Sequence, residues 1–132
     1  MLLDERDTAL LITDAELFAP APLGRQDVLI VAGRVLAIGR DLRPGSAFPV
    51  RRIEARGRLL VPGFVDSLLH IGGGGGEGGF ATRAHPLRAE DALRAGVTTL
   101  IGALGTDEVT RSHADLLACA RALRTEGLSA FV

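Results

Sequence analysis

The chain has 132 residues, 47% of them hydrophobic, so it is long enough and apolar enough to bury a core of its own. Its formal net charge is −1 and no long run of one charge sign occurs, which gives no indication of a nucleic-acid partner or an anionic membrane surface. All 15 basic residues are arginine, which excludes a Schiff-base lysine, a P-loop lysine and a metal-bridging carbamylated lysine within this chain.

The cysteine content and the N-terminal stretch bear on where the protein resides. Cys119 is the single cysteine and cannot form an internal disulfide, which is consistent with a reducing compartment. Acidic residues interrupt the N-terminal stretch too early for a secretory signal, and no apolar run is long enough to span a bilayer. We therefore expect a cytoplasmic protein with no membrane partner.

Residues 8–60 have the pattern of short β-strands. Gly33 and Arg34 separate two apolar runs and predict a hairpin turn between them. Two prolines, a glycine and a serine predict a loop over residues 41–49. The strands are expected at residues 8–12, 28–32, 35–38, 51–55 and 59–61.

From Pro62 onward the pattern changes to alternating strands and helices. Residues 64–71 are mostly apolar, as expected for a strand that is buried on both faces in a parallel sheet. Pro86 predicts the first turn of a helix that ends at Gly96. The apolar face of this helix should carry Ala89, Ala92 and Leu93.

A second strand, over residues 97–104, leads into a second helix. Ser112 and Asp115 resemble a capping box at its start, and Gly127 predicts its end. Its apolar stripe consists of Leu116, Cys119, Ala120 and Leu123. A third strand begins at residues 128–132. This βαβαβ order is the repeat unit of a parallel α/β sheet or barrel, so the sequence predicts an α/β fold divided into residues 1–60 and 61–132.

The glycine-rich stretch after the first predicted barrel strand is the main candidate for a functional loop. His70 ends the strand, Gly72–Gly76 follow, and Glu77 is the one acid among the glycines. A flexible linker is the alternative, but loops at the carboxyl ends of parallel strands are where α/β folds build their sites. A phosphate-binding loop is weakly supported, since the stretch lacks the P-loop lysine motif.

Several other polar residues have both a functional and a structural interpretation. Asp107 and Arg111 follow the second predicted strand, on the side of the glycine loop, but could simply be turn and helix-start residues. His85 and His113 flank predicted helix starts and are expected to be exposed caps. Cys119 lies on a predicted core face and is expected to be inert packing.

Four blocks of the sequence together match a known pattern: VPGFVDSLLHIGGGGGEGG (61–79), TR (82–83), GVTTLIG (96–102) and GTDEVTR (105–111). With these blocks the chain resembles the isoaspartyl dipeptidases (β-aspartyl peptidases) of the amidohydrolase superfamily. The similarity continues through residues 116–127 and into the N-terminal strands, so it spans nearly the whole chain. The glycine–glutamate block and the GTDEVTR block are specific within the superfamily.

The resemblance implies a fold and an activity. The fold is a (β/α)8 barrel preceded by strands of a small β-sandwich, which places the sandwich part at residues 1–60 and the first barrel units at residues 61–132. The activity is that of a zinc metallopeptidase that hydrolyses β-aspartyl dipeptides with two zinc ions. A full-length member is expected to form a homo-oligomer and to take a small dipeptide as its substrate.

The resemblance also implies roles for individual residues. Glu77 would bind the free α-amino group of the substrate, with Gly75 and Gly76 beside it. Thr106 would make another substrate contact. His70 would be a zinc ligand, the second histidine of an H-x-H pair on the first barrel strand.

Two departures from the family pattern bear on activity. Leu68 occupies the position of the first histidine of the pair, and leucine cannot ligate zinc. A closed barrel needs about 250 residues, so the chain supplies only its first units and no catalytic residue can be assigned. We therefore expect an N-terminal portion of the enzyme, inactive alone, that binds zinc weakly. The alternative is a non-catalytic remnant that binds small ligands or another chain through its open sheet edge.

Overall fold

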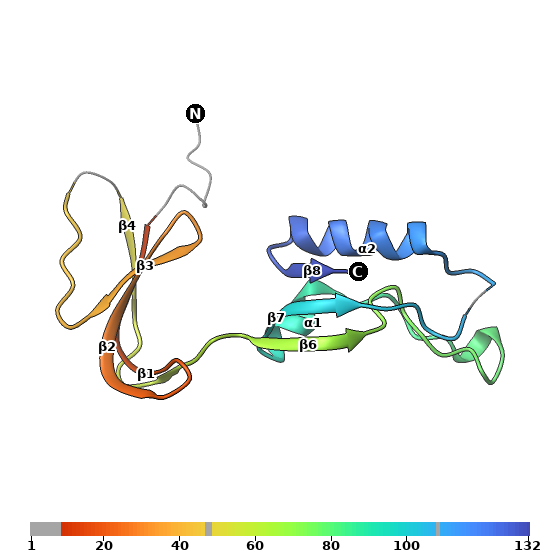
Figure 1. The fold of residues 1–132 in the computed structure, drawn as a ribbon, viewed down its shortest axis with the longest axis horizontal. Helices are drawn as coiled ribbons and strands as arrows, with labels where there is room; N and C mark the ends of the chain where they lie inside the picture. The colour runs from red at the N-terminus through yellow and green to blue at the C-terminus, as the bar shows by residue number, and fades with distance from the viewer. Residues whose placement is uncertain (1–8, 47–48, 108) are drawn as a thin grey trace. The chain divides into compact units, whose positions relative to one another are not determined.

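The computed structural model describes residues 9–46, 49–107 and 109–132, and Figure 1 shows the path of the chain. The chain divides into two compact units, Met1–Pro62 and Gly63–Val132. Strands alone build the described part of the first unit, whereas strands and helices alternate in the second. Among the described residues, no helix has the length and apolar character needed to cross a membrane.

The first unit contains one five-stranded sheet. β1 pairs with β2 in antiparallel fashion and with β4 and β5 in parallel fashion, and β3 continues the sheet beyond β2. Its strands are β1 (Ala9–Phe18), β2 (Pro22–Val31), β3 (Arg34–Gly39), β4 (Val50–Glu54) and β5 (Leu59–Leu60). Ala9, Leu11 and Leu29 form its buried core.

The hairpin predicted at Gly33 is confirmed, since Ala32 and Gly33 form the turn between β2 and β3 with positive φ angles of 48° and 72°. β1 and β2 are longer than predicted. β1 continues past Ile12 through a bulge at Asp14, whose φ angle is 54°. The polar residues that interrupt the apolar pattern at this bulge are the reason that the sequence indicated a shorter strand.

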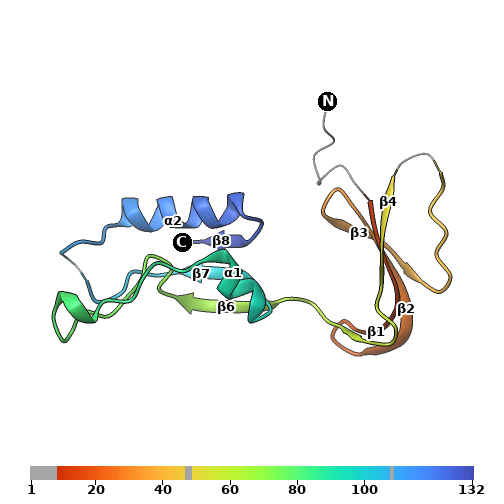
Figure 2. The same cartoon turned by 180° about the vertical axis from the view of Figure 1, so that it is seen from behind.

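The second unit is a three-stranded parallel sheet with two helices on one face. β6 (Phe64–Leu69), β7 (Val97–Gly102) and β8 (Ser129–Phe131) lie side by side in that order. α1 (Ala89–Arg94) connects the first two strands, and α2 (His113–Thr125) connects the last two. Figure 2 shows the helices against the sheet from behind. The α/β fold predicted from the sequence is confirmed for this unit.

The core of the second unit lies between the helices and one face of the sheet. Leu100 of β7 and Ala130 of β8 are completely buried there. Because side chains alternate along a strand, their neighbours Ile101 and Phe131 lie on the opposite face and remain exposed. The rest of this core consists of Ile71, Ala89, Ala92, Leu116, Ala120, Leu123 and Leu128.

Two expectations for the first barrel strand and helix were wrong. Residues 64–71 do not form a strand buried on both faces, because β6 is an edge strand and Phe64 and Val65 are more than 60% exposed. α1 begins at Ala89 rather than at Pro86, and its Leu93 is exposed. Ala89 and Ala92 are buried, so the predicted apolar face holds for two of its three residues.

The second helix follows the prediction closely. The Ser112 hydroxyl accepts a hydrogen bond from the Asp115 amide at 3.2 Å, which caps the helix. Gly127, with a φ angle of 99°, follows its end. At that end the Arg124 guanidinium donates a hydrogen bond to the Ala130 carbonyl at 2.5 Å, which ties the last turn of α2 to β8.

Candidate functional site

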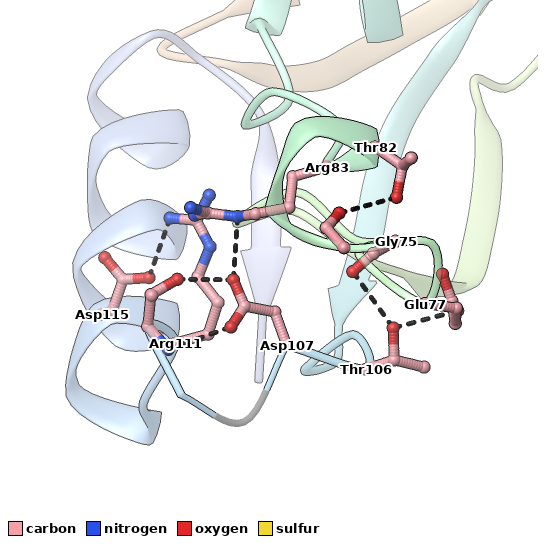
Figure 3. A network of polar contacts seen from close by, with 10 residues as sticks. Gly75, Glu77, Thr82, Arg83, Thr106, Asp107, Arg111 and Asp115 are labelled. Atoms are coloured by element: carbon pink, nitrogen blue, oxygen red, sulfur yellow. Dashed lines mark hydrogen bonds and ion pairs between the residues drawn. The ribbon is translucent and has the colours of Figure 1, made fainter.

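The candidate site is built by two loops of the second unit, shown in Figure 3. The first loop, residues 70–88, follows β6 and contains the glycine-rich stretch and the short 3-10 helix η2 (Phe80–Thr82). The second, residues 103–112, follows β7 and leads into α2. Since both loops leave the carboxyl ends of neighbouring parallel strands, the fold brings them together.

The glycine-rich loop is a defined structure with its own hydrogen bonds. The Ala84 amide donates to the Gly74 carbonyl at 2.7 Å, and Gly75 and Arg83 form an antiparallel bridge. Gly75 and Gly76 have φ angles of 78° and 103°, which side chains with a Cβ atom rarely adopt. The loop therefore doubles back on itself, and it differs in this respect from a free linker.

The two loops approach each other backbone to backbone. A Cβ atom added to Gly105 would lie 2.8 Å from the Gly74 Cα atom, closer than real side chains come. Gly105 is thus required for the approach, independently of its φ angle. The approach places the residue after it, Thr106, beside the glycine-rich loop.

The close approach of the two loops brings Thr106 of the second loop into contact with Glu77 of the first. The Thr106 hydroxyl lies 3.0 Å from the Glu77 Oε1 atom and 3.1 Å from the Gly75 carbonyl oxygen, and it can donate to either. The backbone N–H of Glu77 and then the Thr106 hydroxyl hold the pKa of the Glu77 carboxyl below its ordinary value. Glu77 is therefore a carboxylate near neutral pH, although its side chain is exposed.

A pocket of about 240 Å³ opens beside this carboxylate. Glu77 and Thr106 are among its polar lining residues, and Phe80 and Val109 are its apolar ones. Sites for drug-sized ligands usually enclose ~300–1,000 Å³, so this pocket suits one end of a small ligand. Gly76 and Asp107 complete the lining.

Among the described residues, Asp107 is the charged residue that is buried. The sequence alone allowed both a functional and a structural role for it. Its Oδ2 atom lies 2.8 Å from Arg83 Nε, and its Oδ1 atom accepts a hydrogen bond from the Thr110 amide at 2.9 Å. The Thr110 hydroxyl donates to Oδ2. These two Thr110 donors first, and Arg83 after them, hold the pKa of the Asp107 carboxyl below its ordinary value. The sequence placed Arg83 in one of the blocks that resemble the family but did not predict its pairing with Asp107.

Arg111 does not join this contact. Its guanidinium lies 3.4 Å from the Asp115 carboxylate, one turn further along the chain, as expected for a helix-start residue. His85 and His113 are exposed, as predicted, but the α2 cap is Ser112 rather than His113. Cys119 is half-buried against the core, and burial raises the pKa of its thiol, which agrees with inert packing.

The residues around His70 do not fit a zinc centre. Leu68, at the position of the paired histidine, is 69% exposed and offers no donor atom. The His70 ring nitrogen Nδ1 lies 3.4 Å from the Ala103 carbonyl oxygen, a long contact. Within residues 9–46, 49–107 and 109–132, no three His, Cys, Asp or Glu side chains gather in a group that could hold a metal ion.

Comparisons with known proteins give the class of the fold. No protein-family model matches the chain. The D-hydantoinase of a Thermus species matches 70% of the chain, and 20% of its own length, with a TM-score of 0.54 and 28% identity. The adenine deaminase of Deinococcus radiodurans is 41% identical over 71 residues, 52% of this chain and 13% of that protein. By this similarity, the second unit has an α/β fold like part of an amidohydrolase-type barrel.

A more particular similarity covers nearly the whole chain. The β-aspartyl dipeptidase of Fervidobacterium islandicum AW-1, solved in complex with a β-Asp-Leu dipeptide, matches 93% of the chain with a TM-score of 0.84 and 42% identity. The chain covers 32% of that protein, about a third of its length. The resemblance to an N-terminal portion of the β-aspartyl dipeptidases, predicted from the sequence, is confirmed.

Proposed function

We propose that this chain carries the amino-group-binding part of a hydrolase that acts on β-aspartyl dipeptides. The observation that carries the proposal is the Glu77 carboxylate, which the Thr106 hydroxyl holds at 3.0 Å at the mouth of a small pocket. The similarity to a β-aspartyl dipeptidase solved with β-Asp-Leu supports the choice of substrate.

The chemistry of Glu77 suits a ligand with a free ammonium group. A carboxylate whose pKa is lowered stays charged near neutral pH and can form a charge-assisted hydrogen bond to an ammonium group. An acylated amine would carry no charge and would leave this carboxylate without its partner. Gly75 and Gly76 have no side chains to obstruct a ligand that approaches the loop.

We propose further that the chain does not hydrolyse dipeptides by itself and binds zinc weakly. His70 is the residue that the resemblance assigns to metal, and Leu68 beside it cannot ligate. The resemblance implies two zinc ions for full-length members, but no step of the reaction can be assigned to a metal on the residues of this chain. Its residues bind and orient the substrate.

Ligand binding by the whole 132-residue chain tests this function. Titration with β-Asp-Leu, followed by amide chemical shifts, should move the signals of Glu77 and Thr106, and N-acetyl-β-Asp-Leu should not move them. Glu77→Gln keeps the shape and removes the charge, so it should weaken β-Asp-Leu binding by about tenfold, the worth of one hydrogen bond to a charged group. Thr125→Val, which alters an exposed hydroxyl on α2, is the control. Equal binding of the two dipeptides would contradict the proposal.

A further inference from the structure

Asp107 and Arg83 lie outside the role assigned to Glu77, yet they connect the same two loops. The side chain of Asp107 is 4% exposed and that of Arg83 is 29% exposed, so their ion pair is largely removed from water. A buried ion pair of this kind is strongly disfavoured when one partner is lost, because the other charge is left unpaired. The pair therefore resists separation of the loops.

The geometry explains how this pair could act on Glu77. Figure 3 shows that Thr106 and Asp107, adjacent in the chain, point to different parts of the loop that follows β6. Thr106 reaches Gly75 and Glu77, and Asp107 reaches Arg83. The Gly75–Arg83 bridge connects these two parts of the loop to each other.

We infer that Arg83 and Asp107 are positioning residues, which lock the glycine-rich loop onto the loop after β7 and so keep Thr106 within hydrogen-bond reach of Glu77. The identity of the ligand rests on the proposed function, but the positioning itself does not. The pair acts through Thr106 on Glu77, although Asp107 also lines the pocket beside Glu77. Its effect is to prepare the carboxylate before a ligand arrives, which lowers the cost of ordering the site on binding.

The contacts of Asp107 show which variant isolates this role. Its two bonds to Thr110 are local and shape the turn before α2, whereas the bond to Arg83 is the one that spans the two loops. A substitution at Asp107 disturbs both the turn before α2 and the link between the two loops. A change at Arg83 removes the link between the loops and leaves the turn in place.

The experiment compares Arg83→Gln, Arg83→Lys and the unaltered chain by NMR. The readout is the titration of the Glu77 carboxyl carbon, which a merely stabilising role would not move. Arg83→Gln should raise the pKa of Glu77 toward its ordinary value because the Thr106 hydroxyl is no longer held beside it. Arg83→Lys, which can still pair with Asp107, should restore much of the lowering. Arg88→Gln, which removes an exposed pair with Glu90, should change nothing.

Binding of β-Asp-Leu by the same variants separates the two proposals. We expect about tenfold weaker binding for Arg83→Gln, if one charge-assisted hydrogen bond is lost. If the titration shifts but no variant binds the dipeptide, the positioning role stands and the proposed function fails. An unchanged Glu77 titration in a folded Arg83→Gln chain overturns the positioning role. If that variant does not fold, Arg83→Met, which keeps a long side chain that cannot pair with Asp107, takes its place with the same two outcomes.

Discussion

At the scale of single residues, Leu68 is the position where the chain departs from the histidine pair that the resemblance implies. His70 directly follows β6, and position 68 is two residues before it, the spacing that puts side chains on the same side of an extended chain. We expect Leu68→His to lower the dissociation constant for zinc by about tenfold or more, since a second imidazole would join the first. Calorimetric titration with zinc measures this change.

The control for this substitution is Leu68→Asn, which makes the same exposed position polar but adds no imidazole. Its zinc affinity should equal that of the unaltered chain. Equal affinities for the histidine and asparagine variants would show that His70 does not lie where a pair could form. Tight zinc binding by the unaltered chain would contradict the proposal that its metal site is incomplete.

Asp107 also predicts how the stability of the chain depends on pH. A carboxyl whose pKa is lower in the folded than in the unfolded chain stabilises the fold above the unfolded pKa, and this contribution is lost as the pH falls through the folded pKa. The ordinary value is 3.8 and Thr110, with Arg83, lowers it. We therefore expect the free energy of unfolding to fall as the pH is lowered below about 3.8.

Urea unfolding at a series of pH values measures this dependence. Other carboxyl groups titrate in the same range, so the informative quantity is the difference between the unaltered chain and Asp107→Asn. This difference should shrink as the pH falls, because protonation removes the charge that the variant lacks already. Glu90→Gln controls for the loss of one exposed carboxylate. Parallel curves for the unaltered and Asp107→Asn chains would contradict the prediction.

The sequence led to some site residues and not to others. Glu77 and Thr106 were reached because they stand in blocks that resemble a known family, and their roles stay predictions. The pairing of Arg83 with Asp107 was missed because it joins positions far apart in the chain, and the path of the glycine-rich loop decides whether they meet. The sequence of the two loops contains three arginines and three acidic residues, so charge alone did not identify the pair.

At the scale of the elements, the N-terminal cap of α2 is the feature whose contribution can be measured most directly. The Ser112 hydroxyl accepts a hydrogen bond from the Asp115 amide, one of the donors that a helix start leaves unpaired. Ser112→Ala should lower the free energy of unfolding by about 1 kcal/mol, and Ser112→Asp should retain it. Urea unfolding at neutral pH tests both variants. An unchanged value for Ser112→Ala would show that α2 does not depend on this cap.

Helices and strands were predicted well where a local residue pattern determines their ends. They were predicted poorly where contacts with neighbouring elements determine their ends or their burial. Gly33 and Gly127 lie where a positive φ angle is needed, and both mark the ends of elements as expected. Burial of Phe64 depends instead on what pairs with β6, and the apolar run alone could not show that β6 is an edge strand. The start of α1 was placed at Pro86 because proline fits a first turn, but residues 84–88 are not helical and the helix begins at Ala89.

At the scale of the whole chain, the uncovered face of the second sheet is the feature with the largest consequence. Ile101 of β7 and Phe131 of β8 are paired in register and are 43% and 52% exposed. β6 and β8 are also the sheet edges, with backbone groups available for pairing with another strand. An exposed apolar face with open edges favours association between molecules.

We therefore expect the purified chain to associate as its concentration rises, and light scattering on a sizing column measures this. Replacing Ile101 and Phe131 together by threonine keeps strand-forming residues while removing apolar surface, so it should shift the population toward monomer. The matched control replaces Val35 and Leu36 by threonine, because these residues of β3 are also exposed but belong to the first unit. If the control reduces association as much as the test variant, the interacting surface is not this face. A sharp monomer peak for the unaltered chain at every concentration would contradict the prediction altogether.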